Sequence, residues 1–259
     1  MRDSQHRGQD DRGNGGPAAL ARAVVGRLLA REFVPVKLAD DATVSAISRA
    51  LLDLDPARMA ALRQDLRRNR ISDIDLVDCF FPAVARRLGC AWAEDDAPFT
   101  DVTIGVARMQ AMLREIGRDW TSNLSAEQAS ATVLIVLPEG EQHSFGAVLL
   151  AGQLRRQGIS VRLEVGTHAA ALRRLVEGRF FDCAMISIAC EEKLDHCKAV
   201  VDALKAGSGG RLWVAVGGPL LNRPIDVRRR TGADIATCDP LVALQGALAD
   251  QSQLNELTG

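Results

Sequence analysis

A histidine with a carboxylate two residues before it follows a strongly apolar run in the second half of the sequence. Residues 132–137 (Thr-Val-Leu-Ile-Val-Leu) have the composition of a strand buried on both faces of a parallel sheet. A loop signal, Pro138-Glu139-Gly140, ends the run, and Glu141-Gln142-His143-Ser144 comes next, with Gly146 shortly after. In open α/β sheets, ligands bind beyond the carboxyl ends of the strands. His143 is therefore a candidate binding residue, and the alternative is a surface histidine at the start of a helix.

The spacing Glu141-x-His143-x-x-Gly146 resembles the Asp-x-His-x-x-Gly signature of the cobalamin (B12)-binding domain. In that family the histidine replaces the cofactor's own benzimidazole base and ligates cobalt from below. A neutral imidazole nitrogen suits cobalt(III), and the other ring nitrogen needs a partner that fixes the tautomer, usually a carboxylate. The resemblance implies that His143 is the metal ligand and that Glu141, in place of the family's Asp, is its partner. Gly146 would let the helix start pack close to the cofactor, and Gln142 and Ser144 belong to the same binding stretch.

Further features of the same family follow in the same order along the chain, over about residues 132–248. Ser187-Ile188-Ala189 stands where the family has Ser-x-Leu, whose serine hydrogen-bonds the buried benzimidazole; the alternative is a core serine bonded to backbone. Gly217-Gly218 matches a Gly-Gly that lets the nucleotide tail lie close to the backbone, with an ordinary turn as the alternative. Gly232-Ala233-Asp234 resembles the family's Gly-Ala-Asp, and Thr237 follows the last predicted strand.

The first half of the chain predicts helices only. Apolar residues recur at helical spacing in residues 17–30, 43–54, 56–70, 72–89 and 101–120. Pro82 is a candidate for a kink in the fourth of these helices, and Gly89 lies close to its predicted end. We expect a disordered polar tail at 1–16, a helical bundle at 17–120 and a polar linker at 121–130.

The second half alternates strands with helices. We predict strands at 132–137, 160–165, 181–188, 211–216 and 233–236, and helices at 143–157, 167–177, 191–206 and 240–250. Five such units predict a doubly wound, flavodoxin-like or Rossmann-like five-stranded parallel sheet, so the fold class is α/β with an N-terminal helical bundle. The α/β domain would cover 131–259. Its strand ends should bring His143, Ser187, Gly217-Gly218 and Thr237 to one edge.

A tryptophan in the helical half adds a second resemblance. The stretch from Leu88 to Glu94, Leu-Gly-Cys-Ala-Trp-Ala-Glu, resembles the Leu-Gly-x-x-Trp-x-x-Gly of the helical caps over B12 in methionine synthase and in light-sensing B12 transcription factors. The resemblance implies that Trp92 packs on the upper cobalt face, and the alternative is a core tryptophan of the bundle. The photoreceptors carry a Glu-His pair further along. Here those positions read Val102-Thr103, so we expect no histidine contact above cobalt.

Composition narrows the function classes. The chain has 259 residues, 47% of them hydrophobic, and a formal net charge of -1, which gives no overall field for nucleic acid. The arginine-rich stretches 63–70 and 223–230 are short and typical of solvated surface, so we do not expect direct DNA binding. No apolar run reaches the roughly 18 residues of a membrane span and no signal peptide is visible, so the expected location is cytoplasmic.

The six cysteines form no Cys-x-x-Cys pair and lack the spacing of a zinc module. Most are expected to be small buried residues. Redox sensing by Cys190 and Cys197, which lie seven residues apart near His196, is the alternative.

The sequence shows neither the substrate barrel of a corrinoid enzyme nor the winged-helix domain of the light-sensing repressors, so we expect no enzyme. It is most similar to the AerR/PpaA antirepressors of photosynthesis-gene regulation in purple bacteria, through x-Gln-His-Ser-x-Gly and the residues 92–99, Trp-Ala-Glu-Asp-Asp-Ala-Pro-Phe. This resemblance implies a light-responsive regulator that binds hydroxo- or adenosylcobalamin and then contacts a transcriptional repressor of bacteriochlorophyll and carotenoid genes.

Two alternatives stay open. One is a corrinoid methyl carrier of one-carbon metabolism. The other is a haem-responsive regulator, in which His143, His168, His196 or a cysteine would be the axial ligand.

Overall fold

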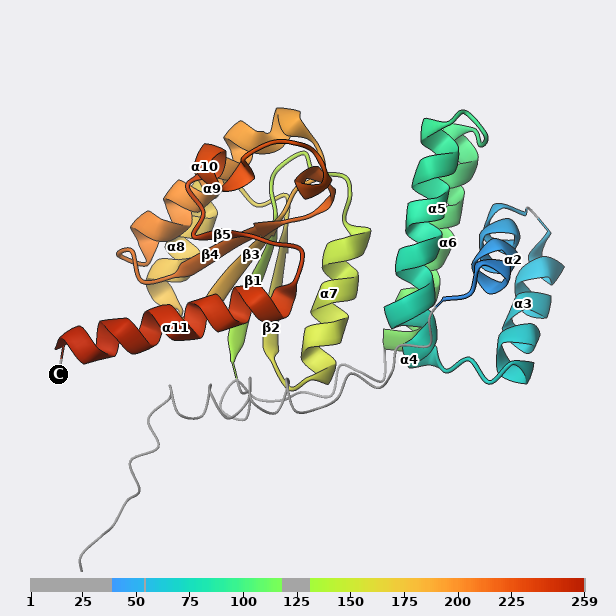
Figure 1. Cartoon of the computed structure of the whole chain (residues 1–259), viewed down its shortest axis with the longest axis horizontal. Helices are drawn as coiled ribbons and strands as arrows, with labels where there is room; N and C mark the ends of the chain where they lie inside the picture. The colour runs from blue at the N-terminus through green and yellow to red at the C-terminus, as the bar shows by residue number, and fades with distance from the viewer. Residues whose placement is uncertain (1–38, 54, 118–130, 259) are drawn as a thin grey trace, which may run out of the picture.

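The computed structural model describes residues 39–53, 55–117 and 131–258. The predicted tail at 1–16, the helix at 17–30 and the linker at 121–130 lie outside these residues. The described chain forms a helical bundle followed by a five-stranded sheet with helices on both faces (Figure 1). The predicted fold class is thereby confirmed.

The sheet is parallel throughout and has the strand order β2-β1-β3-β4-β5. Its strands are β1 (Thr132–Leu137), β2 (Ser160–Val165), β3 (Cys183–Ser187), β4 (Trp213–Gly217) and β5 (Ile235–Ala236). This is the flavodoxin-like order, in which β2 is added on one side of β1 and the later strands on the other, so the strand order reverses between β1 and β3. Ligands bind at that switch point in open α/β sheets, and His143 lies in the loop that follows β1.

Alternate residues of each central strand supply two separate cores. On one face Leu134 and Val136 pack with helices α8 (Ala169–Gly178), α9 (Leu194–Gly207) and α10 (Val227–Thr231). On the other face Val133 and Ile135 pack with α7 (Phe145–Arg156) and α11 (Pro240–Thr258). Both faces are buried, which explains why β1 is an unbroken apolar run.

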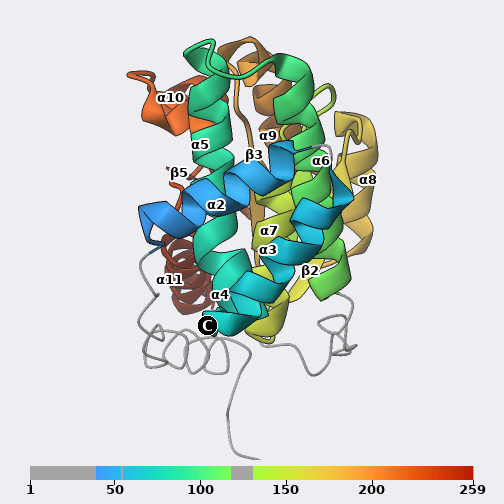
Figure 2. The same cartoon turned by 90° about the vertical axis from the view of Figure 1, so that its right-hand side faces the viewer.

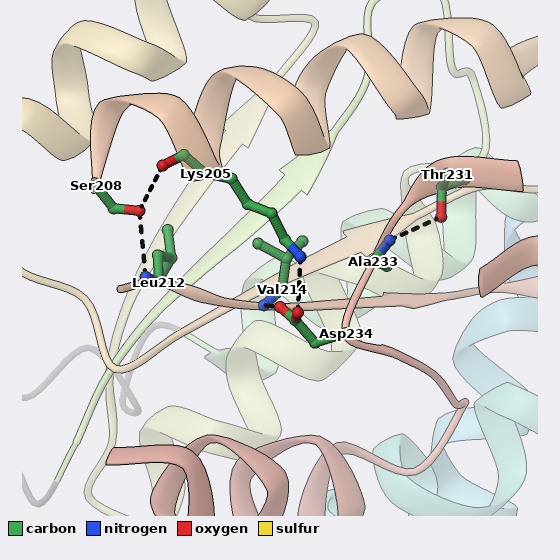
Figure 3. Close-up of polar contacts among 7 residues, drawn as sticks. All are labelled: Lys205, Ser208, Leu212, Val214, Thr231, Ala233 and Asp234. Atoms are coloured by element: carbon green, nitrogen blue, oxygen red, sulfur yellow. Dashed lines mark hydrogen bonds and ion pairs between the residues drawn. The ribbon is translucent and has the colours of Figure 1, made fainter. Parts of the chain in front are cut away.

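Two aspartates close the amino end of the sheet. Asp182 accepts a hydrogen bond from the Thr132 backbone N–H at 2.7 Å. Asp234 accepts one from the Val214 backbone N–H at 2.8 Å and pairs with the Lys205 ammonium at 2.7 Å (Figure 3). The Gly-Ala-Asp stretch therefore joins β4, the start of β5 and α9, which is a structural role at the end of the sheet opposite His143.

The bundle consists of α2 (Asp41–Leu52), α3 (Pro56–Arg68), a helix from residue 73 to 93, and α6 (Phe99–Ile116). The third helix contains α4 (Asp73–Asp75), the π-helical turn η1 (Leu76–Phe80) and α5 (Phe81–Ala93). Pro82 has no N–H to donate to the Asp78 carbonyl, so the α-helical bonding pattern is interrupted at the position where a kink was predicted. The helix then continues past Gly89, which was expected close to its end.

Helix α7 is shared between the two halves of the molecule. Its Ala147, Ala151 and Leu154 pack on the sheet, whereas Phe145 and Leu149 belong to the core of the bundle. The bundle therefore stands against the outer face of α7 (Figures 1 and 2).

Candidate functional site

The turn between β1 and α7 presents His143 at the carboxyl edge of the sheet. Gly140 adopts a left-handed conformation with φ of 74°, and the Glu141 N–H donates to the Pro138 carbonyl at 3.0 Å. This tight turn directs the Glu141 side chain inward while His143 stays at the surface. The side chains are 2% and 58% exposed, respectively.

The Glu141 carboxylate organises the turn through three contacts. Its Oε1 accepts a hydrogen bond from the His143 backbone N–H at 2.9 Å and lies 2.6 Å from His143 Nδ1. Its Oε2 accepts a hydrogen bond from the Ala189 backbone N–H, beyond β3, at 2.9 Å. The carboxylate thus links the histidine turn to the loop after β3, across the switch point of the sheet.

These contacts decide which nitrogen of His143 is available. Burial raises the pKa of Glu141, but the hydrogen bonds from the His143 and Ala189 backbones and from the imidazole outweigh burial and hold that pKa below its ordinary value. An ionised carboxylate can only accept hydrogen bonds, so Nδ1 carries the proton that faces it. The neutral tautomer then has its lone pair on Nε2, the atom that can bind a metal.

The residues beside His143 have different surroundings. The Ser144 hydroxyl accepts a hydrogen bond from Gln110 of α6 at 3.3 Å, so the bundle contacts the histidine turn. At Gly146 a methyl group would find no heavy atom within 4 Å, which leaves this side of α7 open. Gln142 is exposed.

The strand ends gather as predicted, but the two glycines there pack against the protein's own backbone. Ser187, half-buried at the end of β3, lies opposite Gly217 in the register of β3 and β4. A Cβ atom on Gly217 would lie 2.7 Å from the Thr237 carbonyl oxygen. One on Gly218, where φ is 106°, would lie 2.4 Å from the Ile188 carbonyl oxygen. The turn alternative for Gly217-Gly218 therefore accounts for both glycines through close backbone packing.

Trp92 lies in the last turn of α5, at the tip of the bundle. Its side chain is 51% exposed and its ring lies 6.0 Å from that of Phe99, which begins α6 and is 64% exposed. The alternative of a core tryptophan is therefore wrong. The tip and the β1–α7 turn lie at the same end of the molecule (Figure 1).

His143 does not belong to a multidentate metal site within the described ranges. In residues 39–53, 55–117 and 131–258, no group of three or more His, Cys, Asp or Glu side chains could hold a metal ion. The site can supply one oriented imidazole nitrogen to a metal whose other positions are filled by its own ligands. His168 pairs with Glu139 at 2.7 Å at the surface, and His196 is exposed.

Only half of the cysteines are buried, whereas most were expected to be. Cys79, Cys183 and Cys197 are buried, Cys190 is partly buried, and Cys90 and Cys238 are exposed. Burial raises the pKa of Cys197 to about 12, so this thiol is protonated at neutral pH and lacks the thiolate that a redox sensor needs.

Sequence reasoning missed the two contacts that fix the site to its surroundings. The Ala189 contact is made by a backbone N–H, so no side-chain motif in the sequence predicts it. Gln110 lies in an ordinary helical pattern, 34 residues before Ser144.

Over the described residues, the helices are too short or too polar to cross a membrane.

No protein-family model matches the sequence. Among solved structures, the monomethylamine corrinoid protein of Methanosarcina barkeri is similar, with a TM-score of 0.62 and 13% identity. The likeness covers 78% of this chain and 95% of that one, so it extends beyond the sheet into the helical bundle. At this identity the likeness shows the fold alone.

A sequence relative is more informative about kinship. It is an uncharacterized 20.5 kDa protein from the bchF–crtJ intergenic region of Rhodobacter capsulatus, 33% identical over 181 residues. The match covers 70% of this chain and 94% of the relative. The chain therefore belongs to the same protein family as the 20.5 kDa protein of the Rhodobacter capsulatus bchF–crtJ region.

Proposed function

We propose that this protein binds cobalamin at the carboxyl edge of its sheet, with His143 Nε2 as the lower axial ligand of cobalt. The observation that carries the proposal is the Glu141–His143 pair at the switch point of the sheet, with Oε1 2.6 Å from Nδ1. At many metal sites a carboxylate orients the histidine ligand by accepting a hydrogen bond from the ring nitrogen that does not bind the metal.

The single imidazole favours a metal that brings its own macrocycle. A bare transition metal requires several protein ligands, and a corrin supplies the four equatorial nitrogens itself. The fold likeness to a corrinoid protein of Methanosarcina barkeri supports the same choice. The open side of α7 at Gly146 and the half-buried Ser187 lie on the elements that would contact the cofactor.

The role of the loaded protein is regulatory in this proposal, and the protein is not an enzyme. The relative in Rhodobacter capsulatus is encoded between bchF and crtJ, which supports a function linked to pigment genes. From the AerR/PpaA resemblance we infer that the protein is an antirepressor, which acts in the cytoplasm by contact with a repressor protein and does not bind DNA itself. Adenosylcobalamin would supply a cobalt–carbon bond that light can break. The repressor contact would then follow from a different affinity of the ligand for two arrangements of the bundle.

A methyl carrier of one-carbon metabolism is the second candidate. The fold likeness to the monomethylamine corrinoid protein is the observation that favours it. Such a carrier would exchange a methyl group with a partner methyltransferase and would need no response to light.

The decisive experiment is a visible absorption spectrum of the purified protein after mixing with hydroxocobalamin, adenosylcobalamin or haemin and removal of free cofactor. Each sample is measured in darkness and after illumination, for the unmodified protein and for His143→Ala. His168→Ala is the matched control because its imidazole also pairs with a glutamate, at 2.7 Å, and lies at the surface.

We expect a retained corrin spectrum that is lost or shifted in His143→Ala and unchanged in His168→Ala. Retention of neither corrin would overturn the cobalamin proposal, and retention of haemin instead would favour the haem regulator. A retained corrin without any light-dependent difference would favour the methyl carrier.

A further inference from the structure

The outer edge of β2 pairs with no other strand within the described part of the chain. β2 is the first strand in the order of the sheet, and β1 binds its inner edge (Figure 1). The Ser160 N–H donates to the Ala131 carbonyl at 2.8 Å, so this backbone group points toward β1. Because backbone groups point to alternate edges along a strand, those of Val161, Leu163 and Val165 point outward. Such a row of N–H and C=O groups is a template for another strand.

The side chains of β2 are less covered than those of its neighbour. β1 is fully buried from Val133 to Leu137, whereas the residues of β2 are half-buried and Val165 is 54% exposed. One outward group already has a partner, since the Val161 carbonyl accepts a hydrogen bond from Arg155 of α7 at 3.0 Å. A carbonyl oxygen has a second lone pair, so this contact does not close the edge to a further strand.

The two charged residues of β2 lie on the face opposite its apolar ones. Val161 and Leu163 pack against the core beneath α7, so Arg162 and Glu164 project from the other face. The Arg162 Nε donates to the Glu164 carboxylate at 2.7 Å, and the Thr167 hydroxyl donates to the same carboxylate at 2.8 Å. Among the described residues, Arg162 uses Nε alone, which leaves both terminal amino groups of its guanidinium to donate to another acceptor.

The sequence of β2 is complementary to itself in the antiparallel direction. When two copies of the strand run antiparallel with Leu163 at the centre, Val161 of each copy lies opposite Val165 of the other. In the same register, Arg162 of each copy lies opposite Glu164 of the other, and opposite charges across strands are stabilising. The outward N–H and C=O groups then face one another. A shift of the centre by one residue would instead bring inward-pointing groups together, so the register is fixed.

We propose that β2 pairs antiparallel with β2 of a second copy of this chain and joins the two sheets into one continuous sheet. The contact is isologous, with a two-fold axis at Leu163, so each copy supplies the same residues. It covers the exposed Val165 with Val161 of the second copy. Charges on an edge strand often prevent pairing, but here the two signs stand at the spacing that matches them to each other. The pairing is independent of the cofactor.

The test is the oligomeric state of the full chain without cobalamin, measured by sedimentation velocity over a series of concentrations. Arg162→Glu places two carboxylates on β2 and Glu164→Arg places two guanidinium groups there, so either variant alone sets like charges opposite each other. In a mixture of the two variants, opposite charges face each other again. The matched control is Arg173→Glu with Glu177→Arg, which reverses an ion pair of 3.0 Å on α8, away from the edge.

We expect the unmodified chain and the α8 control to form a dimer. The dissociation constant of the dimer should rise roughly tenfold or more in each charge variant alone, because two attractive cross-strand pairs become two repulsive ones. The mixture should associate about as tightly as the unmodified chain. Val165→Asp should also weaken the dimer, since it places a carboxylate opposite Val161 of the second copy, and the single chain tolerates it at this exposed position.

A chain that stays monomeric throughout the series would overturn the proposal, as would a dimer that tolerates both charge variants and Val165→Asp, because it would use another surface. A mixture that associates no better than the two variants apart would refute the register. Circular dichroism establishes first that each variant is folded. If a charge reversal unfolds the chain, Val165→Asp decides the test, and an unchanged dissociation constant in that variant refutes the pairing.

Discussion

The substitution Glu141→Gln tests whether the buried carboxylate selects the metal-binding state of His143. Glutamine preserves the shape of the side chain but replaces an acceptor-only group by one acceptor oxygen and one donor NH2. If the NH2 group faces the imidazole, Nδ1 must accept, and the proton moves to Nε2, where it blocks the metal. If the NH2 group faces the loop after β3, it meets the Ala189 N–H, which donates at 2.9 Å in the unmodified protein.

Either orientation is costly because the Glu141 side chain is only 2% exposed. Hydrogen bonds to a charged group contribute about 1.5–3 kcal/mol each, and neutral ones about 0.5–1.5 kcal/mol. Loss of the charge across the contacts with His143 and Ala189 should lower the free energy of unfolding by about 1–3 kcal/mol. Loss of the partner that orients a metal ligand typically weakens metal affinity about 10- to 100-fold.

Urea unfolding of the protein without cofactor measures the first quantity, and spectral titration with hydroxocobalamin measures the second. Glu139→Gln is the matched control, because Glu139 also pairs with a histidine, His168, but is 53% exposed. If Glu141→Gln bound the corrin as tightly as the unmodified protein with the same spectrum, the carboxylate would not select the tautomer.

The pH dependence of stability provides a second readout of the same group. The pKa of Glu141 is lowered in the folded state, against an ordinary value of about 4.3. Its stabilising effect is therefore present above the unfolded value and is lost as the pH falls through the folded value. The stability gap between the unmodified protein and Glu141→Gln should be constant near neutrality and shrink below about pH 4. A gap that stays constant in urea unfolding down to pH 3 would contradict the assignment.

Three further substitutions separate packing from binding. Gly218→Ala should lower the melting temperature, because φ is 106° and the new Cβ would meet the Ile188 carbonyl oxygen at 2.4 Å. Gly146→Ala should instead raise the free energy of unfolding by about 0.5–1 kcal/mol as a helix substitution in open space, yet weaken corrin retention. Unchanged retention would argue that α7 does not approach the cofactor there. Phe145→Ala should lower the free energy of unfolding by about 3–5 kcal/mol, since the buried ring packs on Phe81. A decrease below about 1 kcal/mol in urea unfolding would show that the bundle hardly depends on α7.

The local sequence pattern was sufficient to predict the bounds of two of the strands. The bounds of β1 and β2 agree with the prediction, because loop signals on both sides of an apolar or alternating run mark where the strand begins and ends. β3 is shorter than the predicted 181–188, because Phe181 and Ile188 are buried beyond the ends of the strand pairing. An apolar residue is buried whether or not its backbone pairs with a neighbouring strand, so the apolar pattern overestimates the length of β3.

The placement of bundle and sheet was beyond the sequence pattern. A bundle, a linker and a sheet domain were expected as successive units, but α7 uses opposite sides for both cores. An apolar residue on a helix does not reveal which neighbour it faces. Phe145 became a bundle residue and Ala147 a sheet residue only when the chain had folded.

The candidate site divides along the same line. The sequence alone determined that a histidine with a nearby carboxylate follows a buried strand, because residue type and spacing are local properties. It also determined that a Gly-Gly pair and a serine follow later strands. Tertiary structure decided that Glu141 reaches the Ala189 N–H 48 residues away, that backbone carbonyls fill the space beside Gly217 and Gly218, and that Trp92 is exposed. Each of these depends on what the rest of the chain brings into contact, and strand order and helix packing fix such contacts without a trace in the local sequence.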